Sequence, residues 1–181
     1  MDYLKLIPVP APETINGHCH AARVSTMEAI LGTPGLARGK VSAKIRARVY
    51  TANVGPFKVT GFGPFLDVLT ALFKRVKRDE PSLYVALGSA GCLNVRTVRG
   101  GHNPSNHSWG TAVDVTLAGK LDAYDDDKVQ QGMLRLYGHI KAHGLETGDW
   151  LYWGAEFGRE DGMHFEASDE LIRKWHTEGV I

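Results

Sequence analysis

The spacing of apolar residues predicts four helices along the chain. The clearest lies over residues 65–76, where apolar side chains recur at intervals of three and four positions and form one continuous face. A second helix is expected over about 127–143, where Gly144 is a typical stop signal, and a third begins near Ser168. A short helix is expected at about 26–31.

Alternating apolar and polar residues predict strands in four other segments. The clearest are 112–117 and 163–167, which place apolar side chains on one face and polar side chains on the other. Alternation over 45–49 and 83–87 predicts two more strands, and a break near residue 55 indicates a hairpin. Because strands and helices are interspersed without βαβ regularity, we expect an α+β fold, an antiparallel sheet flanked by helices.

Length and composition indicate one globular domain. The chain has 181 residues, of which 43% are hydrophobic and 23% are charged, a globular composition that argues against disorder. No repeat or linker divides the chain, but its proline-rich start differs from the rest. We expect residues 1–60 to form an N-terminal arm with a short helix and strand, and residues 61–181 to form the functional core. The formal net charge of +1 argues against a nucleic-acid-binding protein.

Features that would direct the protein to a membrane or an oxidising compartment are missing from the sequence. No apolar stretch approaches the roughly 20 residues of a membrane span, and no basic segment followed by an apolar one predicts a signal peptide. We therefore expect a cytoplasmic location in the producing cell, with any outside action depending on release or another export route. Cys19 and Cys92 are too few for a disulfide scaffold and are interpreted as reduced thiols.

Polar residues on the two clearest strands suggest a metal site. Asp114 and His164 project from the face opposite the apolar side chains, and His107 lies in the loop that enters the first of these strands. Two imidazoles and one carboxylate are a ligand set of catalytic zinc sites, which keep a fourth position open for water. A lone aspartate or histidine more often has a structural role, so both interpretations remain open on spacing alone.

A catalytic site of this kind also needs a base that takes the proton of the attacking water. Asp161 lies three residues before His164 and is the first candidate for this role. Glu160 is the competing candidate.

Three further clusters invite interpretation as metal sites, but their spacing does not support it. The aspartates at 125–127 lack the glycine and glutamate of a calcium loop and suit a helix start. His139 and His143 lack the glutamate of an H-E-x-x-H motif. The loop 101–107 contains a histidine–asparagine–histidine pattern, but neither a metal finger nor the basic charge of such nucleases accompanies it.

The chain resembles a known peptidase family in three motifs. The first is the signature S-x-H-x-x-G-x-A-x-D, which is matched by Ser105, His107, Gly110, Ala112 and Asp114. It is typical of the zinc D-alanyl-D-alanine carboxypeptidases and L-alanyl-D-glutamate endopeptidases, peptidoglycan peptidases that share a fold with the N-terminal signalling domain of hedgehog proteins.

The other two motifs resemble those of phage endolysin-type members of that family. Residues 153–157 read W-G-A-E-F, with alanine at the second glycine of W-G-G-[DE]-[FW], and residues 161–166 match D-x-x-H-F-E. The similarity covers roughly residues 60–176. The first sixty residues resemble no family and contain no repeats typical of a cell-wall-binding module.

The resemblance implies one zinc ion per chain, held by His107, Asp114 and His164. It implies that Asp161 is the general base. These peptidases also carry an arginine upstream of the first zinc histidine, which helps to hold the substrate and the developing oxyanion. Arg96 is favoured for this role.

The upstream loop offers a second arginine, Arg99, which is nearly as good a candidate and is otherwise expected to bind substrate. Ser105 and Trp153 are also expected to bind substrate, since both stand in the matched motifs.

The implied activity is hydrolysis of an amide bond in the peptidoglycan stem peptide. The similarity to endolysins favours an L-Ala–D-Glu endopeptidase, and a D-Ala-D-Ala carboxypeptidase is the alternative. A different class is a non-catalytic zinc-binding interaction domain, as in hedgehog signalling, which would have no reason to keep Asp161 beside a complete ligand set. We expect a monomer whose partner is the stem peptide, with no nucleic acid and no membrane span.

Overall fold

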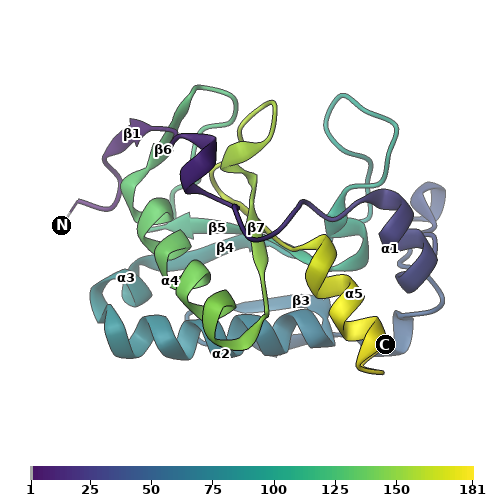
Figure 1. Cartoon of the computed structure of the whole chain (residues 1–181). Coiled ribbons are helices and arrows are strands. Elements are labelled where there is room, and N and C mark those ends of the chain that lie inside the picture. Colours follow the sequence, from purple (N-terminus) through teal and green to yellow (C-terminus); the bar gives the residue numbers. More distant parts are fainter. Residues whose placement is uncertain (1) are drawn as a thin grey trace.

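Helices and antiparallel strands are interspersed along the chain, which confirms the predicted α+β class. The computed structural model describes residues 2–181 and is shown in Figure 1. Its helices are α1 (Val24–Leu31), α2 (Gly63–Asp79), α3 (Pro81–Ala86), α4 (Gln131–Thr147) and α5 (Asp169–Thr177). Its strands are β1 (Leu6–Pro8), β2 (Val49–Asn53), β3 (Lys58–Phe62), β4 (Leu87–Gly91), β5 (Ala112–Leu117), β6 (Lys128–Gln130), β7 (Leu151–Trp153) and β8 (His164–Ala167). None of the helices in this range is long and apolar enough to cross a membrane.

The main sheet has four antiparallel strands in the order β4-β5-β8-β7. Its two central strands, β5 and β8, are the two clearest strands of the sequence pattern, and their register places Asp114 directly opposite His164. Two smaller antiparallel pairs, β1-β6 and β2-β3, lie outside this sheet. The central pairing therefore brings two candidate ligands together from positions fifty residues apart.

Helix α2 supplies much of the hydrophobic core. The face predicted from the apolar spacing is buried, including Phe65, Leu69, Leu72 and Val76. The helix packs against α4 and against the β2-β3 hairpin, on the side of the molecule away from the long loops in Figure 1. The loops that carry the candidate chemistry gather at the opposite side.

Helix α4 is shifted from its predicted position. Residues 128–130, expected in its first turn, form β6 instead, because they pair with β1. Gly144 does not stop the helix but lies inside it against the ring of Trp150, which a Cβ atom at this position would overlap. The stop is Gly148, whose positive φ of 75° is the left-handed conformation typical of a helix C-cap.

Two of the weaker strand predictions are wrong. Residues 81–86 form α3, and the side chain of Val85, expected to be buried in a strand, is 83% exposed. Residues 46–48 form a 3₁₀ turn, and the strand follows at 49–53 as the first arm of the predicted hairpin. In both segments a short run of alternating residues suits a turn of helix as well as a strand.

The first sixty residues share the core of the rest of the chain. Ile15, Met27 and Leu31 are buried in the same hydrophobic cluster as the apolar face of α2. Helix α1 packs against α5. The division into an arm and a core at residue 60 stays a prediction.

Asp169 links the start of α5 to the segment before α1. Its buried carboxylate pairs with Arg23 at 3.0 Å and with Arg173 at 2.7 Å. Although burial acts to raise the pKa of Asp169, the hydrogen bonds from Arg23 and its other partners outweigh this effect and hold the pKa well below its usual range.

We expect Asp169→Asn to lower the free energy of unfolding at pH 7 by about 1–3 kcal/mol, since it removes charged hydrogen bonds from a buried carboxylate. Because the pKa is depressed in the folded state, this stabilisation is complete above the unfolded pKa of about 3.9 and is lost as the pH falls through the folded pKa. Urea unfolding of both proteins at pH 7 and pH 3 measures the difference, which should shrink at pH 3. An equal difference at both pH values would contradict the assignment.

Candidate active site

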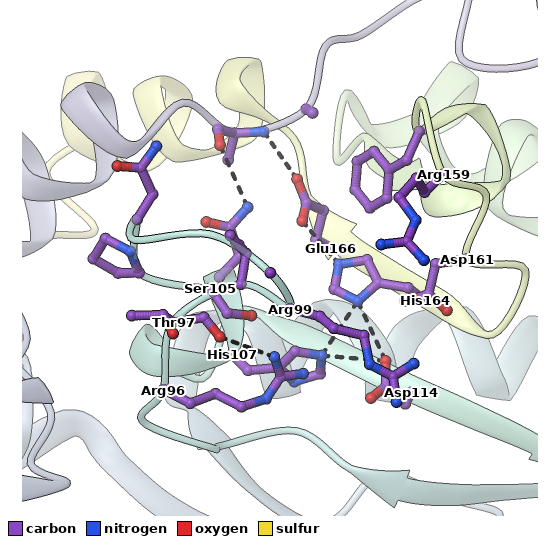
Figure 2. Close-up of a pocket in the computed structure, with 18 of the residues that line it drawn as sticks. Arg96, Thr97, Arg99, Ser105, His107, Asp114, Arg159, Asp161, His164 and Glu166 are labelled. Atoms are coloured by element: carbon purple, nitrogen blue, oxygen red, sulfur yellow. Dashed lines mark hydrogen bonds and ion pairs between the residues drawn. The ribbon is translucent and has the colours of Figure 1, made fainter. Parts of the chain in front are cut away.

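A cavity of about 920 Å³ opens where the long loops meet the end of the main sheet (Figure 2). Three loops and a short N-terminal segment form its walls. The lining residues that carry charge or metal-binding atoms are Arg96, Arg99, His107, Asp114, Arg159, Asp161, His164 and Glu166. The cavity therefore joins all three candidate ligands and the first candidate base.

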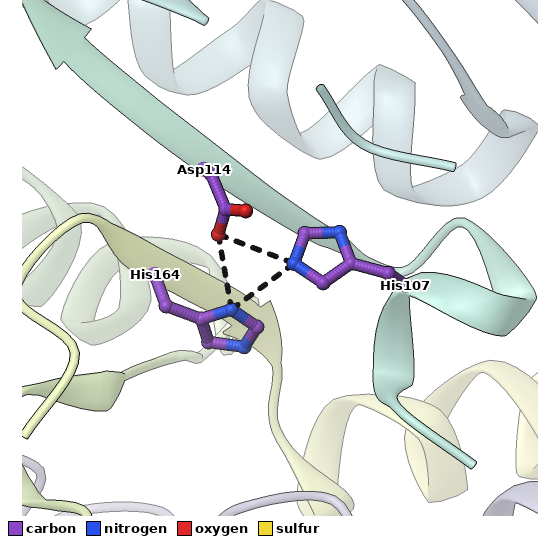
Figure 3. A group of neighbouring side chains, drawn as sticks. All are labelled: His107, Asp114 and His164. Carbon is purple, nitrogen blue, oxygen red and sulfur yellow. Dashed lines mark hydrogen bonds and ion pairs between the residues drawn. The ribbon is translucent and has the colours of Figure 1, made fainter. Parts of the chain in front are cut away.

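His107, Asp114 and His164 form a compact triangle (Figure 3). The distances from His107 Nε2 to Asp114 Oδ1, from His107 Nε2 to His164 Nδ1, and from His164 Nδ1 to Asp114 Oδ1 are each 3.2 Å. Asp114 and His164 come from β5 and β8, whereas His107 lies in the 3₁₀ turn Asn106–Trp109. Gly110 ends that turn with a positive φ of 69°, close to the backbone of Gly61, so a larger residue would displace His107.

The triangle fits the donor set and the size of a zinc site. Ligand atoms about 2.0–2.1 Å from a tetrahedral zinc ion lie about 3.3 Å from one another, close to the separations between these three side chains. Among residues 2–181, these are the three side chains that group closely enough to hold a metal ion. One face of such a site would remain open to the cavity.

The second ring nitrogen of each histidine has a fixed partner. His107 Nδ1 lies 2.7 Å from the carbonyl oxygen of Cys92, and His164 Nε2 lies 2.9 Å from a carboxylate oxygen of Glu166. Both partners accept a hydrogen bond, so each imidazole carries its proton there and turns its other nitrogen to the triangle. This arrangement is typical of metal-ligating histidines.

The surroundings of the triangle favour positive charge. Burial acts to raise the pKa of Asp114, but hydrogen bonds with His107 and His164 outweigh it and hold this pKa below its usual range. Burial likewise acts to lower the pKa of His164, but its hydrogen bonds to Asp114 and Glu166 raise it to about 10. Two carboxylates thus favour a cation at this point, and a divalent metal ion would supply that charge.

Asp161 and Glu160 point to different surroundings. Asp161 lines the cavity, and its Oδ1 has no hydrogen-bond partner among residues 2–181. Burial raises the pKa of its carboxyl. Glu160 is buried away from the cavity, where its two oxygens accept hydrogen bonds from the backbone N–H groups of Asp126 and Asp127 at 3.0 and 3.3 Å. Both oxygens of the Glu160 carboxylate are thus occupied by hydrogen bonds, whereas the carboxylate of Asp161 is available to accept a proton.

The two arginines expected from the sequence both line the cavity, as does Ser105. Arg96 and Arg99 lie on the loop before His107, whose two sides are joined by backbone hydrogen bonds from Val98 to Asn103 and from Ser105 to Arg96. A third arginine, Arg159, enters from the loop between β7 and β8. The sequence motifs contain no signal for this residue, because it lies between two matched segments at a position that neither fixes.

Trp153, expected from the motif to bind substrate, is not among the residues that line the cavity. Its side chain is fully buried between the rings of Tyr137 and Phe165, with centroid distances of 5.2 and 5.9 Å. Its Nε1 donates a hydrogen bond of 2.8 Å to the carbonyl oxygen of Gly162. This hydrogen bond connects Trp153 to the loop that carries Asp161, and its role in substrate binding stays a prediction.

A segment from the start of the chain forms part of the cavity wall. Ala21 and Ala22 line the cavity, and the N–H group of Ala22 donates to Glu166 Oε1 at 3.0 Å. Asn106 holds the carbonyl oxygen of Ala22 from the other side at 3.4 Å. Glu166 therefore connects this segment to the imidazole of His164.

We expect Glu166→Gln to weaken zinc binding about 10–100-fold, because the amide no longer accepts two hydrogen bonds and His164 loses its fixed orientation. Competition with a zinc chelator measures the affinity. Glu170→Gln is the matched control, since Glu170 bonds to His20 of the same N-terminal segment but does not reach His164. If both variants lose zinc equally, the effect comes from the segment and the assigned role of Glu166 is wrong.

Comparison with known proteins agrees with the residues that form the site. A family model described as D-alanyl-D-alanine carboxypeptidase matches residues 99–167, a segment that contains the whole triangle and Asp161. Searches of curated proteins and of solved structures give no match. The resemblance stated from the motifs is therefore confirmed over this segment. Residues 99–167, which carry the candidate metal site, are similar to the family of D-alanyl-D-alanine carboxypeptidases.

Proposed function

We propose that this protein is a zinc-dependent peptidase that hydrolyses an amide bond in the peptidoglycan stem peptide, as an L-Ala–D-Glu endopeptidase. The observation that carries the proposal is the triangle of His107, Asp114 and His164, with Asp161 beside it in one open cavity. The triangle would hold the metal. A bound zinc ion supplies Lewis-acid chemistry, which polarises carbonyl groups and makes water a nucleophile near neutral pH.

The chain's own residues would supply the remaining functions of a hydrolase. Asp161 would take a proton from the attacking water and pass it to the leaving amine, because it lines the cavity and its buried Oδ1 has no hydrogen-bond partner among residues 2–181. Arg96 or Arg99 would stabilise negative charge on the scissile carbonyl oxygen. Cys92 and Glu166 would keep both imidazoles in the orientation that presents a lone pair to the metal.

The choice between the two peptidase activities rests on the endolysin-like motifs. A D-Ala-D-Ala carboxypeptidase remains the second candidate, favoured by the description of the matching family. A non-catalytic zinc-binding domain would not require the unpartnered carboxylate of Asp161.

The test is mass spectrometry of purified sacculi after digestion with the zinc-loaded protein. An endopeptidase leaves new termini at L-alanine and at D-glutamate, whereas a carboxypeptidase releases single D-alanine residues. The same protein treated with a chelator is the control. Release of D-alanine alone would identify a D-Ala-D-Ala carboxypeptidase instead of an endopeptidase. The absence of any cleavage would support a non-catalytic zinc-binding domain.

We also propose that the protein acts as a monomer and reaches the cell wall after release from the producing cell or by another export route. The expected location in that cell is the cytoplasm.

A further inference from the structure

Tyr124 connects the three loops around the cavity. The guanidinium carbon of Arg99 lies 5.1 Å from the centre of its ring, and that of Arg159 lies 5.0 Å from it. All three residues line the cavity, and the backbone of Tyr124 pairs with that of Asp161. The ring therefore holds two positive side chains next to the candidate base, through contacts between cations and an aromatic face.

Both arginines keep hydrogen-bond donors available. Arg159 uses its Nε to donate to Asp125 at 2.8 Å, and neither of its Nη groups has a partner among residues 2–181. Arg99 forms no ion pair with any side chain among residues 2–181. Arg96 differs, because its guanidinium donates to the carbonyl oxygen of Thr97 at 3.2 Å. Arg99 and Arg159 therefore bring guanidinium donors to the cavity that the bond to Asp125 does not use.

Both arginines line the cavity in which substrate would react. Arg99 and Arg159 share this cavity with Asp114, Asp161 and His164 (Figure 2). The planar end of a guanidinium matches the two oxygens of a carboxylate, which it binds with two parallel hydrogen bonds. A carboxylate carried near the cleaved bond would therefore meet these donors while the amide lies at the metal site.

We propose that Arg99 and Arg159, held by Tyr124, recognise a free α-carboxylate on the residue that carries the leaving amine, and so distinguish D-glutamate from its uncharged amide. This inference rests on the proposed endopeptidase function, in which that residue is D-glutamate. A primary amide in the same position has lost the negative charge and offers one oxygen in place of two. The protein would therefore act on stem peptides with unamidated glutamate in preference to amidated ones.

The test compares two synthetic peptides that contain the L-Ala–D-Glu bond, one with the free α-carboxylate and one with the carboxamide. We expect kcat/KM to be about 10–100-fold higher for the carboxylate, the range that charged hydrogen bonds account for. Arg159→Gln should reduce this ratio to near one. Arg38→Gln is the matched control, because Arg38 is exposed, lies outside the cavity and loses the same charge; it should keep the ratio.

Variants of the ring test how the arginines are held. Tyr124→Phe keeps the aromatic face and should keep the ratio, whereas Tyr124→Ala should lower it. Equal kcat/KM values for the two peptides in the unchanged protein, or an unchanged ratio in Arg159→Gln, would overturn the inference. Failure of the proposed function would look different, since neither peptide would then be cut at the L-Ala–D-Glu bond.

Discussion

Replacing His107, Asp114 or His164 with alanine is expected to remove zinc from the protein and to abolish hydrolysis. Each variant leaves two of the three ligand atoms that now lie 3.2 Å from one another. The loss of affinity should exceed the roughly 10–100-fold caused by removing a hydrogen-bonded neighbour of a ligand. Elemental analysis after dialysis measures the zinc content, and stoichiometric zinc in all three variants would refute the ligand assignment.

The matched control for the ligand variants is His139→Ala. His139 lies outside the cavity on α4, where its ring bonds to Glu80 at 3.1 Å. This variant should keep one zinc per chain and full hydrolysis. Thermal melting gives a second measurement. A ligand that binds only the folded state, at a free concentration of 100 times its Kd, stabilises that state by about 2.7 kcal/mol. Added zinc should raise the melting temperature of the control but not of the ligand variants.

The candidate metal site could be predicted from the sequence because its parts are local. Two of the three candidate ligands, His107 and Asp114, lie within one short motif, and the alternation of β5 and β8 already places Asp114 and His164 on one face. The strands pair in the register that brings these two side chains together. Long amphipathic helices such as α2 could be predicted for the same reason, since one periodic segment carries the whole signal.

The parts that escaped prediction depend on contacts between distant segments. Ala22 reaches the site through a hydrogen bond to Glu166, which lies 144 residues away, and no local pattern shows it. Tyr124 and Arg159 meet only because their two loops fold over the same cavity. The prediction that the helix stops at Gly144 failed for a related reason. Glycine is needed there because its Cα packs against the ring of Trp150, and not because the backbone turns out of the helix.

Buried aromatic residues show a further limit of motif-based reasoning. Trp153 lies in a matched motif, yet it is fully buried and donates a hydrogen bond to the loop before β8. Trp109, which occupies a variable position inside the first motif, is equally buried and donates a hydrogen bond of 2.7 Å to the carbonyl oxygen of Gly32. A motif indicates that a residue belongs to the site region, but the structure decides whether it faces the cavity or the core.

Asp161→Asn is expected to lower the rate of hydrolysis by about 10²–10⁴-fold, which corresponds to roughly 3–5 kcal/mol of activation barrier, while zinc content stays at one per chain. Asparagine has the same shape but cannot accept the proton of the attacking water. The carboxylate of Asp161 is suited to this step because it lines the cavity and one of its oxygens has no partner within residues 2–181. Turnover of a stem-peptide substrate, zinc content and thermal melting should be measured on the same samples.

Glu160→Gln separates the role of the base from a general effect of removing negative charge. The carboxylate of Glu160 bonds to the backbone N–H groups of Asp126 and Asp127 and does not line the cavity, so this variant should lose some stability but keep most of its activity. Activity retained in Asp161→Asn and lost in Glu160→Gln would move the base by one residue. If both variants remain active, the proton is taken by another group, and Asp161 would then have to be explained as a buried structural carboxylate whose raised pKa reflects burial alone.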